Sequence, residues 1–315
     1  MRDLRILFMG TPDFAVETLK AIIENNYNVV GVITAPDRPA GRGRKLRASA
    51  VKEYAISKNL NILQPTNLKD ESFIEELKKL QANLNIVVAF RMLPKVVWDM
   101  PEYGTFNLHA SLLPDYRGAA PINWAVINGE SKTGITTFFI DEKIDTGHII
   151  LQKEIEIQNN DTAGILHDKL MTEGASLVID TIKEIANDTV TTKEQPKEGE
   201  LKTAYKLHRD NTKINWSDGI ESIYNLIRGL SPYPSAWCSL YNKGEEVSIK
   251  IYNAEIENRE HSFDTGKVIV EDSVIKVAVN KGYIILNKIQ LPGKKAMDAK
   301  ALLNGYTFYK DAKMG

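Results

Sequence analysis

The chain has 315 residues, of which 43% are hydrophobic and 26% are charged, and its formal net charge is −1. This composition is typical of a globular protein of one or two domains, and so small a net charge excludes a global attraction to nucleic acid. The single cysteine, Cys238, excludes an internal disulfide and a multi-cysteine metal site. Residues 1–14 hold too short an apolar run for a signal peptide, and no later run reaches membrane-spanning length, so we expect a cytoplasmic protein.

Strand and helix signals alternate over the first part of the chain. Apolar runs predict strands at 4–9, 29–34, 61–63, 84–90 and 105–108. Helical spacing predicts helices at 14–23, 49–58 and 70–80. Before the first helix, the hydroxyl of Thr11 is expected to cap the free N–H groups, and Pro12 to take the first helical position. This order predicts an α/β fold with a doubly wound, Rossmann-like parallel sheet.

The second part of the chain has a different character. Two β-like segments at 133–141 and 148–157 precede an amphipathic helix at 162–186, and the polar stretch 187–202 has no periodicity. A helix at 219–230 then leads into short strands at 236–241, 246–256, 267–270, 274–279 and 283–291, which predict a small OB-like β-barrel. We therefore predict a catalytic domain at 1–188, a linker at 189–208 and a barrel domain at 209–315.

The densest polar cluster of the first domain follows its last parallel strand. Asn107 and His109 are two residues apart, so they project to one side of a strand end, which is where open α/β sheets bind ligands. An amide and an imidazole there can donate to a developing oxyanion, and the imidazole can also move a proton. By itself, the pair also fits an ordinary strand end.

The surrounding residues resemble the folate-dependent formyltransferases. That family shares a strand-end Asn-x-His followed by Ser-Leu-Leu-Pro, a Tyr-Arg-Gly turn and an Asp-x-Gly loop after a β-hairpin. Here these motifs are Asn107 to His109, Ser111 to Pro114, Tyr116 to Gly118 and Asp145 to Gly147, and the resemblance also covers Gly10 to Phe14. It implies 10-formyltetrahydrofolate as the formyl donor and no metal.

The resemblance also implies roles for individual residues. Asn107 and His109 would stabilise the oxygen of a tetrahedral intermediate, and Asp145 would take the proton from the attacking amine. The folate pocket would be formed by Ser111, Leu112, Leu113, Pro114, Phe90 and Arg91. Arg91 departs from the family, which commonly has glycine there, so it is expected to reshape the pocket rim or to contact the glutamate tail of the ligand.

Asp-Thr-Gly occurs a second time at Asp264 to Gly266, and two such triplets suit an aspartic protease. Such a protease is almost wholly β, whereas this chain begins with alternating helices and strands. His148 and Lys267 also stand where that fold usually has a hydroxyl residue. The second triplet is better interpreted as a turn.

A basic loop follows the second predicted strand. Two glycines and a proline separate its basic residues, and no acid follows Asp37 within it; the residues are Arg38, Arg42, Arg44, Lys45 and Arg47. Such a loop suits a phosphate backbone, and it resembles the branch of the family that formylates initiator methionyl-tRNA. The barrel also suits RNA, with Lys202, Lys206 and Arg209 as candidate contacts.

Two other functions stay open. A formyltransferase acting on an amino-sugar nucleotide would keep the same chemistry but is expected to lack the basic loop. A non-catalytic RNA-binding protein would have no use for Asn107, His109 and Asp145 together. We expect a monomer, because tRNA would have to bridge both domains.

Overall fold

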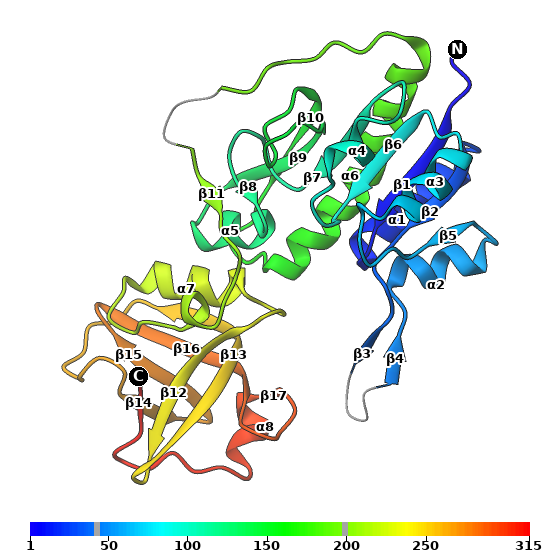
Figure 1. Ribbon diagram of the computed structural model, residues 1–315. Coiled ribbons are helices and arrows are strands. Elements are labelled where there is room, and N and C mark those ends of the chain that lie inside the picture. Colours follow the sequence, from blue (N-terminus) through cyan, green and yellow to red (C-terminus); the bar gives the residue numbers. More distant parts are fainter. Residues whose placement is uncertain (41–44, 197–200) are drawn as a thin grey trace. The chain divides into compact units, whose positions relative to one another are not determined.

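The computed structural model describes residues 1–40, 45–196 and 201–315 (Figure 1). The chain divides into two compact units. The first contains Met1–Gly118, Thr133–Ile155 and His167–Thr203, and the second contains Ala119–Lys132, Glu156–Leu166 and Ala204–Gly315. The chain therefore passes from one unit to the other more than once. The single boundaries predicted at 188 and 209 remain a proposal.

The first unit is built on a seven-stranded sheet with the order β10-β9-β7-β6-β1-β2-β5. Five of these strands are parallel neighbours: β1 (Arg5–Gly10), β2 (Asn28–Ile33), β5 (Ile62–Leu63), β6 (Leu84–Val88) and β7 (Thr105–His109). Next to β7 lies β9 (Lys132–Phe139), which runs antiparallel to it, and β10 (Ile149–Glu156) follows at the edge. The predicted Rossmann-like sheet is confirmed.

Helices cover both faces of this sheet. They are α1 (Asp13–Glu24), α2 (Ala50–Ser57), α3 (Glu71–Lys79), α4 (Lys95–Trp98) and α6 (Ala163–Asn187). Leu7, Met9 and Val87 pack on one face with apolar residues of α3 and α4. On the other face, Gly174 of α6 leaves room for Leu108, whose methyl carbon would lie 2.8 Å from an added Cβ. All five residues of β6 are buried because helices cover both faces, and the one polar residue among them, Asn85, donates its side-chain N–H to Val97 O.

The helix starts are set by local capping. The side chain of Ser49 accepts the Lys52 N–H at the start of α2, and that of Asp70 accepts the Ser72 and Phe73 N–H groups at the start of α3. The predicted cap of α1 was wrong. Its N-cap residue is Pro12, in extended backbone and without a side-chain cap, so Thr11 lies before the cap. The helix begins one residue later than predicted, at Asp13, whose negative charge suits the first turn of a helix.

A short hairpin lies between β2 and α2. Its strands β3 (Arg38–Ala40) and β4 (Lys45–Arg47) pair with each other only, with Arg38 opposite Arg47, and form a separate two-stranded sheet. These strands carry most of the basic residues that the sequence places in a loop, and Arg42 and Arg44 lie outside the described residues. Figure 1 shows the hairpin extending away from the parallel sheet.

The second unit is an antiparallel barrel. Its sheet has the order β14-β15-β16-β13-β12-β18, and β17 (Met297–Asp298) pairs with β16. The main strands are β12 (Ala236–Asn242), β13 (Glu245–Glu257), β14 (Val268–Glu271), β15 (Val274–Val279), β16 (Gly282–Gln290) and β18 (Lys313–Met314). A bridge between Lys267 and Lys313, and the Val268 N–H donating to Ala312 O at 3.0 Å, bring β14 to β18. The predicted small barrel is confirmed.

The barrel interior is closed by helices. Ile223 and Ile227 of α7 (Ile220–Gly229) belong to the same apolar core as Cys238, and α8 (Ala299–Leu303) contributes Leu302. The helix α5 (Pro121–Ile127) also belongs to this unit, where the side chain of Asn123 donates to Gly229 O at 2.8 Å. No helix among the described residues combines the length and the apolar character that crossing a bilayer requires.

Candidate active site

The first two candidate residues lie at the carboxyl end of β7. Asn107 stands opposite Val87 of β6 and Phe138 of β9, and His109 stands opposite Thr136. His109 is buried, whereas Asn107 is half-buried and its side-chain amide bonds to none of the described residues. The alternation of the strand places both side chains on one side, as the sequence predicts. The Asn107 amide is therefore available to a ligand.

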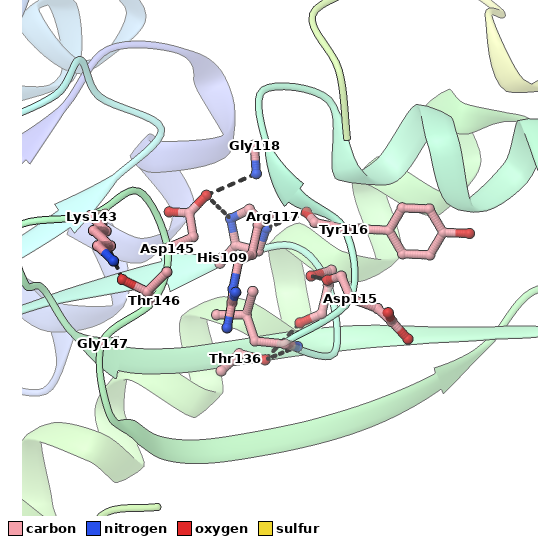
Figure 2. Close-up of polar contacts among 12 residues, drawn as sticks. His109, Asp115, Tyr116, Arg117, Gly118, Thr136, Lys143, Asp145, Thr146 and Gly147 are labelled. Atoms are coloured by element: carbon pink, nitrogen blue, oxygen red, sulfur yellow. Dashed lines mark hydrogen bonds and ion pairs between the residues drawn. The ribbon is translucent and has the colours of Figure 1, made fainter. Parts of the chain in front are cut away.

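The imidazole of His109 has a defined orientation (Figure 2). Its Nε2 lies 2.9 Å from the backbone oxygen of Tyr116, and because a carbonyl can only accept, Nε2 carries the proton of this bond. Its Nδ1 lies 3.9 Å from Oδ2 of Asp145. Nδ1 is thus the nitrogen that faces the carboxylate. Both side chains are largely buried, with exposed fractions of 9% for His109 and 13% for Asp145.

Asp145 is held in an unusual backbone conformation. Its φ of 55° lies in the left-handed region, and its Oδ2 accepts the Gly118 N–H at 2.9 Å. Among the described residues, no donor contacts Oδ1 of Asp145. One carboxylate oxygen is therefore fixed by the protein and the other is available to accept a proton.

The Asp145 loop, residues 141–148, is shaped by two further residues. The hydroxyl of Thr146 donates to Oδ1 of Asp141 at 2.7 Å. A Cβ at Gly147 would lie 1.7 Å from the backbone oxygen of Phe139, so this position requires glycine. The third residue of the Asp-Thr-Gly triplet is therefore explained by a close backbone approach.

Two residues without a predicted role, Gln195 and Arg117, complete the site. Gln195 donates to Asp145 O at 3.1 Å and to Gly147 O at 2.7 Å. Its Oε1 accepts from Nε and a terminal nitrogen of Arg117 at 3.1 and 2.7 Å. Gln195 lies in the stretch predicted as a linker, where a lone amide among polar residues gives no signal. Two backbone hydrogen bonds between Lys193 and Ile149 fix that part of the chain beside β10.

The Ser-Leu-Leu-Pro turn is held by a buried hydroxyl. Thr136 of β9 donates to Ser111 O at 2.6 Å and accepts the Leu113 N–H at 3.2 Å. The side chain of Gln152 donates to Leu113 O at 2.9 Å and to the Thr136 hydroxyl at 3.0 Å. The Leu113–Pro114 peptide bond is cis. Leu113 is buried and Leu112 half-buried, and this turn directly follows His109.

The other pocket candidates follow β6. Arg91 donates to the backbone oxygens of Thr66 and Pro65, and its guanidinium carbon lies 5.7 Å from the Phe90 ring centroid. Burial, followed by the charge of Arg38, lowers the pKa of Arg91. The Arg91 side chain is therefore held by the backbone before α3. Its guanidinium is also repelled by the positive charge of Arg38, in the first strand of the basic hairpin.

The base of the hairpin is also anchored. Asp37 accepts from Nζ of Lys52 at 2.7 Å and from the side chain of Gln64 at 2.9 Å. These hydrogen bonds, from Gln64 first and then Lys52, lower the pKa of Asp37. Arg38 and Arg47 are exposed. These two arginines can therefore meet a ligand in solution.

The remaining candidates lie apart from this cluster in the sequence. The N–H of Lys202 donates to Asp115 at 3.1 Å, Lys206 is exposed, and the guanidinium of Arg209 stacks on Trp237 at 4.1 Å. Asp264 belongs to the second unit, where its backbone oxygen accepts the Lys267 N–H in a turn, as predicted. The part of the chain that the structure describes holds no cluster of three or more His, Cys, Asp or Glu side chains suited to a metal.

Comparison with known proteins shows similarity along the whole chain. Residues 4–182 match the family model described as formyl transferase, and residues 206–307 match that of the formyl transferase C-terminal domain. The methionyl-tRNA formyltransferase of Flavobacterium johnsoniae is 62% identical over 314 residues, which cover 100% of both chains. That of Bacteroides thetaiotaomicron is 51% identical over 317 residues, covering 99% of this chain and 98% of the relative.

Solved structures with this fold are more distant in sequence. The sugar 3N-formyl transferase WlaRD, with dTDP and 5-N-formyl-THF, has a TM-score of 0.65 and 21% identity, covering 94% of this chain and 100% of that one. HypX from Aquifex aeolicus, in complex with tetrahydrofolic acid, has a TM-score of 0.65 and 15% identity, covering 96% of this chain and 47% of that one. At these identities the likeness supports the fold alone.

Proposed function

The chain belongs to the formyl transferase family, and from that premise we propose that it moves the formyl group of 10-formyltetrahydrofolate to the methionine α-amino group of initiator methionyl-tRNA. The observation that carries this proposal is full-length identity of 62% to a relative named for that reaction. The product would be the formylated tRNA that begins translation. We also propose that the protein acts as a monomer in the cytoplasm.

The proposed reaction needs two kinds of help from the protein. The amine nitrogen attacks the formyl carbon, and the carbonyl oxygen becomes an oxyanion as the new C–N bond forms. The bond to N10 of the folate then breaks, and the proton lost by the amine ends on N10 of tetrahydrofolate. The site must therefore stabilise an oxyanion and carry one proton.

We assign oxyanion stabilisation to Asn107 and His109. The Asn107 amide has N–H groups that bond to none of the described residues. His109 already uses Nε2–H on Tyr116 O, so it can donate to an oxyanion only through Nδ1, in its doubly protonated form. The Asp145 carboxylate, 3.9 Å from Nδ1, complements the positive charge of that form. This sharpens the role that the family resemblance implies.

We assign the proton transfer to Asp145. Its Oδ2 is held by the Gly118 N–H, so Oδ1 is the atom that would take the proton, directly or through a water. General-base catalysis is worth roughly 10²- to 10⁴-fold. Asp145→Asn should therefore lower kcat by that factor, because an amide keeps the size but accepts a proton poorly.

The substrates would bind on either side of these groups. We propose that the folate contacts Ser111, Leu112, Leu113 and Pro114, with Phe90 and Arg91 at the rim. Arg38, Lys45 and Arg47 of the hairpin, together with Arg42 and Arg44, would contact tRNA phosphates. Support for this division comes from the Thr136 bonds that hold the turn and from the exposure of Arg38 and Arg47.

The proposal is tested by offering two acceptors in parallel. Purified protein with 10-formyltetrahydrofolate is mixed with charged initiator tRNA or with an amino-sugar nucleotide, and the formylated product is detected by mass spectrometry. We expect transfer to the tRNA and none to the sugar. Transfer only to the sugar would establish the alternative enzyme, and no transfer with intact tRNA binding would establish a non-catalytic RNA-binding protein. Either result refutes the proposal.

A further inference from the structure

The structure assigns Gln195 as a positioning residue: its side-chain amide holds the backbone of the Asp145 loop against the Arg117–Gly118 turn. We define the Gln195 bridge as the hydrogen bonds of this amide to Asp145 O, Gly147 O and the Arg117 guanidinium. The inference deepens the proposed function and rests on it, because it takes Asp145 as the proton acceptor.

The Gln195 bridge is part of a closed hydrogen-bond network that includes Asp145. Arg117 donates to Oε1 of Gln195, and the Gln195 amide donates to Asp145 O. The Asp145 carboxylate accepts from Gly118, the residue that follows Arg117. Backbone and side chain of Asp145 are thus tied to neighbouring points of one turn. This double attachment leaves the carboxylate little freedom to move relative to His109.

The chemistry of the bridge requires an amide. The two backbone oxygens can only accept and the guanidinium can only donate, so a side chain with both a donor NH₂ and an acceptor oxygen is needed. Gln195 is only 3% exposed, and its polar atoms are all engaged. A carboxylate at this position would keep the Arg117 bonds but would place negative charge against both loop carbonyls.

Asp145 needs such support because its backbone is strained. A φ of 55° is uncommon outside glycine, and it persists only where the surroundings enforce it. Two of the enforcing bonds come from Gln195, one on Asp145 and one on Gly147. Without them the loop can relax, and a displacement of about 1 Å costs roughly 10²-fold in rate. The hydrogen bonds of the Gln195 side chain go to neither the 111–114 turn nor the described strands of the basic hairpin, so binding of both substrates should be spared.

The test compares Gln195→Met, which keeps the length but makes none of these bonds, with Gln195→Glu, which keeps only the acceptor. For both we expect kcat to fall about 10- to 100-fold, with KM for folate and tRNA changed less than about twofold. The decisive measurement adds Gln195→Met to Asp145→Asn in single-turnover assays. If Gln195 acts through Asp145, it causes no further loss once the carboxylate is absent.

A matched control removes a different buried hydrogen bond from the same unit. The hydroxyls of Thr137 and Thr181 bond at 2.8 Å, so Thr181→Val should lower thermal stability without changing kcat. Far-ultraviolet circular dichroism checks that every variant is folded, and Gln195→Glu replaces Gln195→Met if the latter is not.

The outcomes distinguish a failure of the proposed function from a failure of the role assigned to Gln195. Wild-type protein that formylates no tRNA refutes the proposed function. Wild-type activity together with an unchanged kcat in both Gln195 variants overturns only the inference. Losses that multiply in the double variant, or that appear in KM alone, also overturn it, because Gln195 would then act independently of Asp145.

Discussion

A single methyl group at Gly147 provides the sharpest probe of the Asp145 loop. In Gly147→Ala the new Cβ would lie 1.7 Å from Phe139 O, 2.9 Å from its carbonyl carbon and 3.4 Å from the Asp141 nitrogen. All three neighbours are backbone atoms, so no side-chain rotation relieves the overlap. The loop itself has to move away from the end of β9.

The size of that movement follows from contact distances. Carbon and oxygen approach no closer than about 3.3 Å in favourable contacts, so the separation has to grow by roughly 1.5 Å. Gly147 is two residues from Asp145, and a misplacement of about 1 Å costs roughly 10² in rate. We therefore expect kcat to fall at least about 100-fold, equivalent to ~2.7 kcal/mol of transition-state stabilisation. Overpacking should also cost about 1–3 kcal/mol of folding stability.

The assay is steady-state formylation of initiator methionyl-tRNA, with urea unfolding of the same samples. The control is Gly305→Ala, where an added Cβ meets nothing within 4 Å, and which should match wild type in both measurements. A folded Gly147→Ala protein with wild-type kcat would refute the reasoning. Either the loop would then absorb the methyl group without moving Asp145, or the carboxylate would not take part in the reaction.

Further predictions address the 111–114 turn, the hairpin and the barrel core. Thr136→Val leaves partners in the 111–114 turn unpaired, which should raise the folate KM about tenfold in kinetic assays. Reversing Arg38 and Arg47 to Glu should weaken tRNA binding and reduce its salt slope by about 2, with donor hydrolysis unchanged. Burial raises the pKa of Cys238 to about 12, so the folded thiol should resist iodoacetamide at pH 8, as mass spectrometry can check. Because the pKa of this thiol is higher in the folded than in the unfolded protein, it leaves the free energy of unfolding unchanged below about pH 8.5 and lowers it as the pH rises toward 12.

Periodicity was sufficient to predict most of the fold. The apolar residues of β6, with Asn85 as the one exception, identify a strand covered on both faces, and the strands β12 to β16 are separated by turns that the sequence marks clearly. The hairpin β3–β4 was not predicted as strands. Its two segments are Arg-Pro-Ala and Lys-Leu-Arg, which are too short to display an alternation of apolar and polar residues. These two strands pair only with each other.

The site was predicted where its signal is local. Asn107 and His109 share a strand face because of the two-residue period, which the sequence displays directly. Gln195 depends on contacts across 48 to 78 residues with Gly147, Asp145 and Arg117, and no local pattern encodes these. Likewise, the tautomer of His109 depends on the backbone oxygen of Tyr116, whose left-handed φ of 59° has no sequence signature.

The separate sheet of β3 and β4 makes the hairpin a modular element. Asp37 anchors its base to Lys52 of α2 and to Gln64 after β5, and the Arg38–Arg47 pair closes the strands. The described strands of the hairpin share no backbone pairing with the parallel sheet. Its length and charge can therefore change by insertion or deletion while the register around His109 stays the same. Natural variation or protein engineering can in this way exchange the element proposed to recognise the acceptor and retain the chemistry.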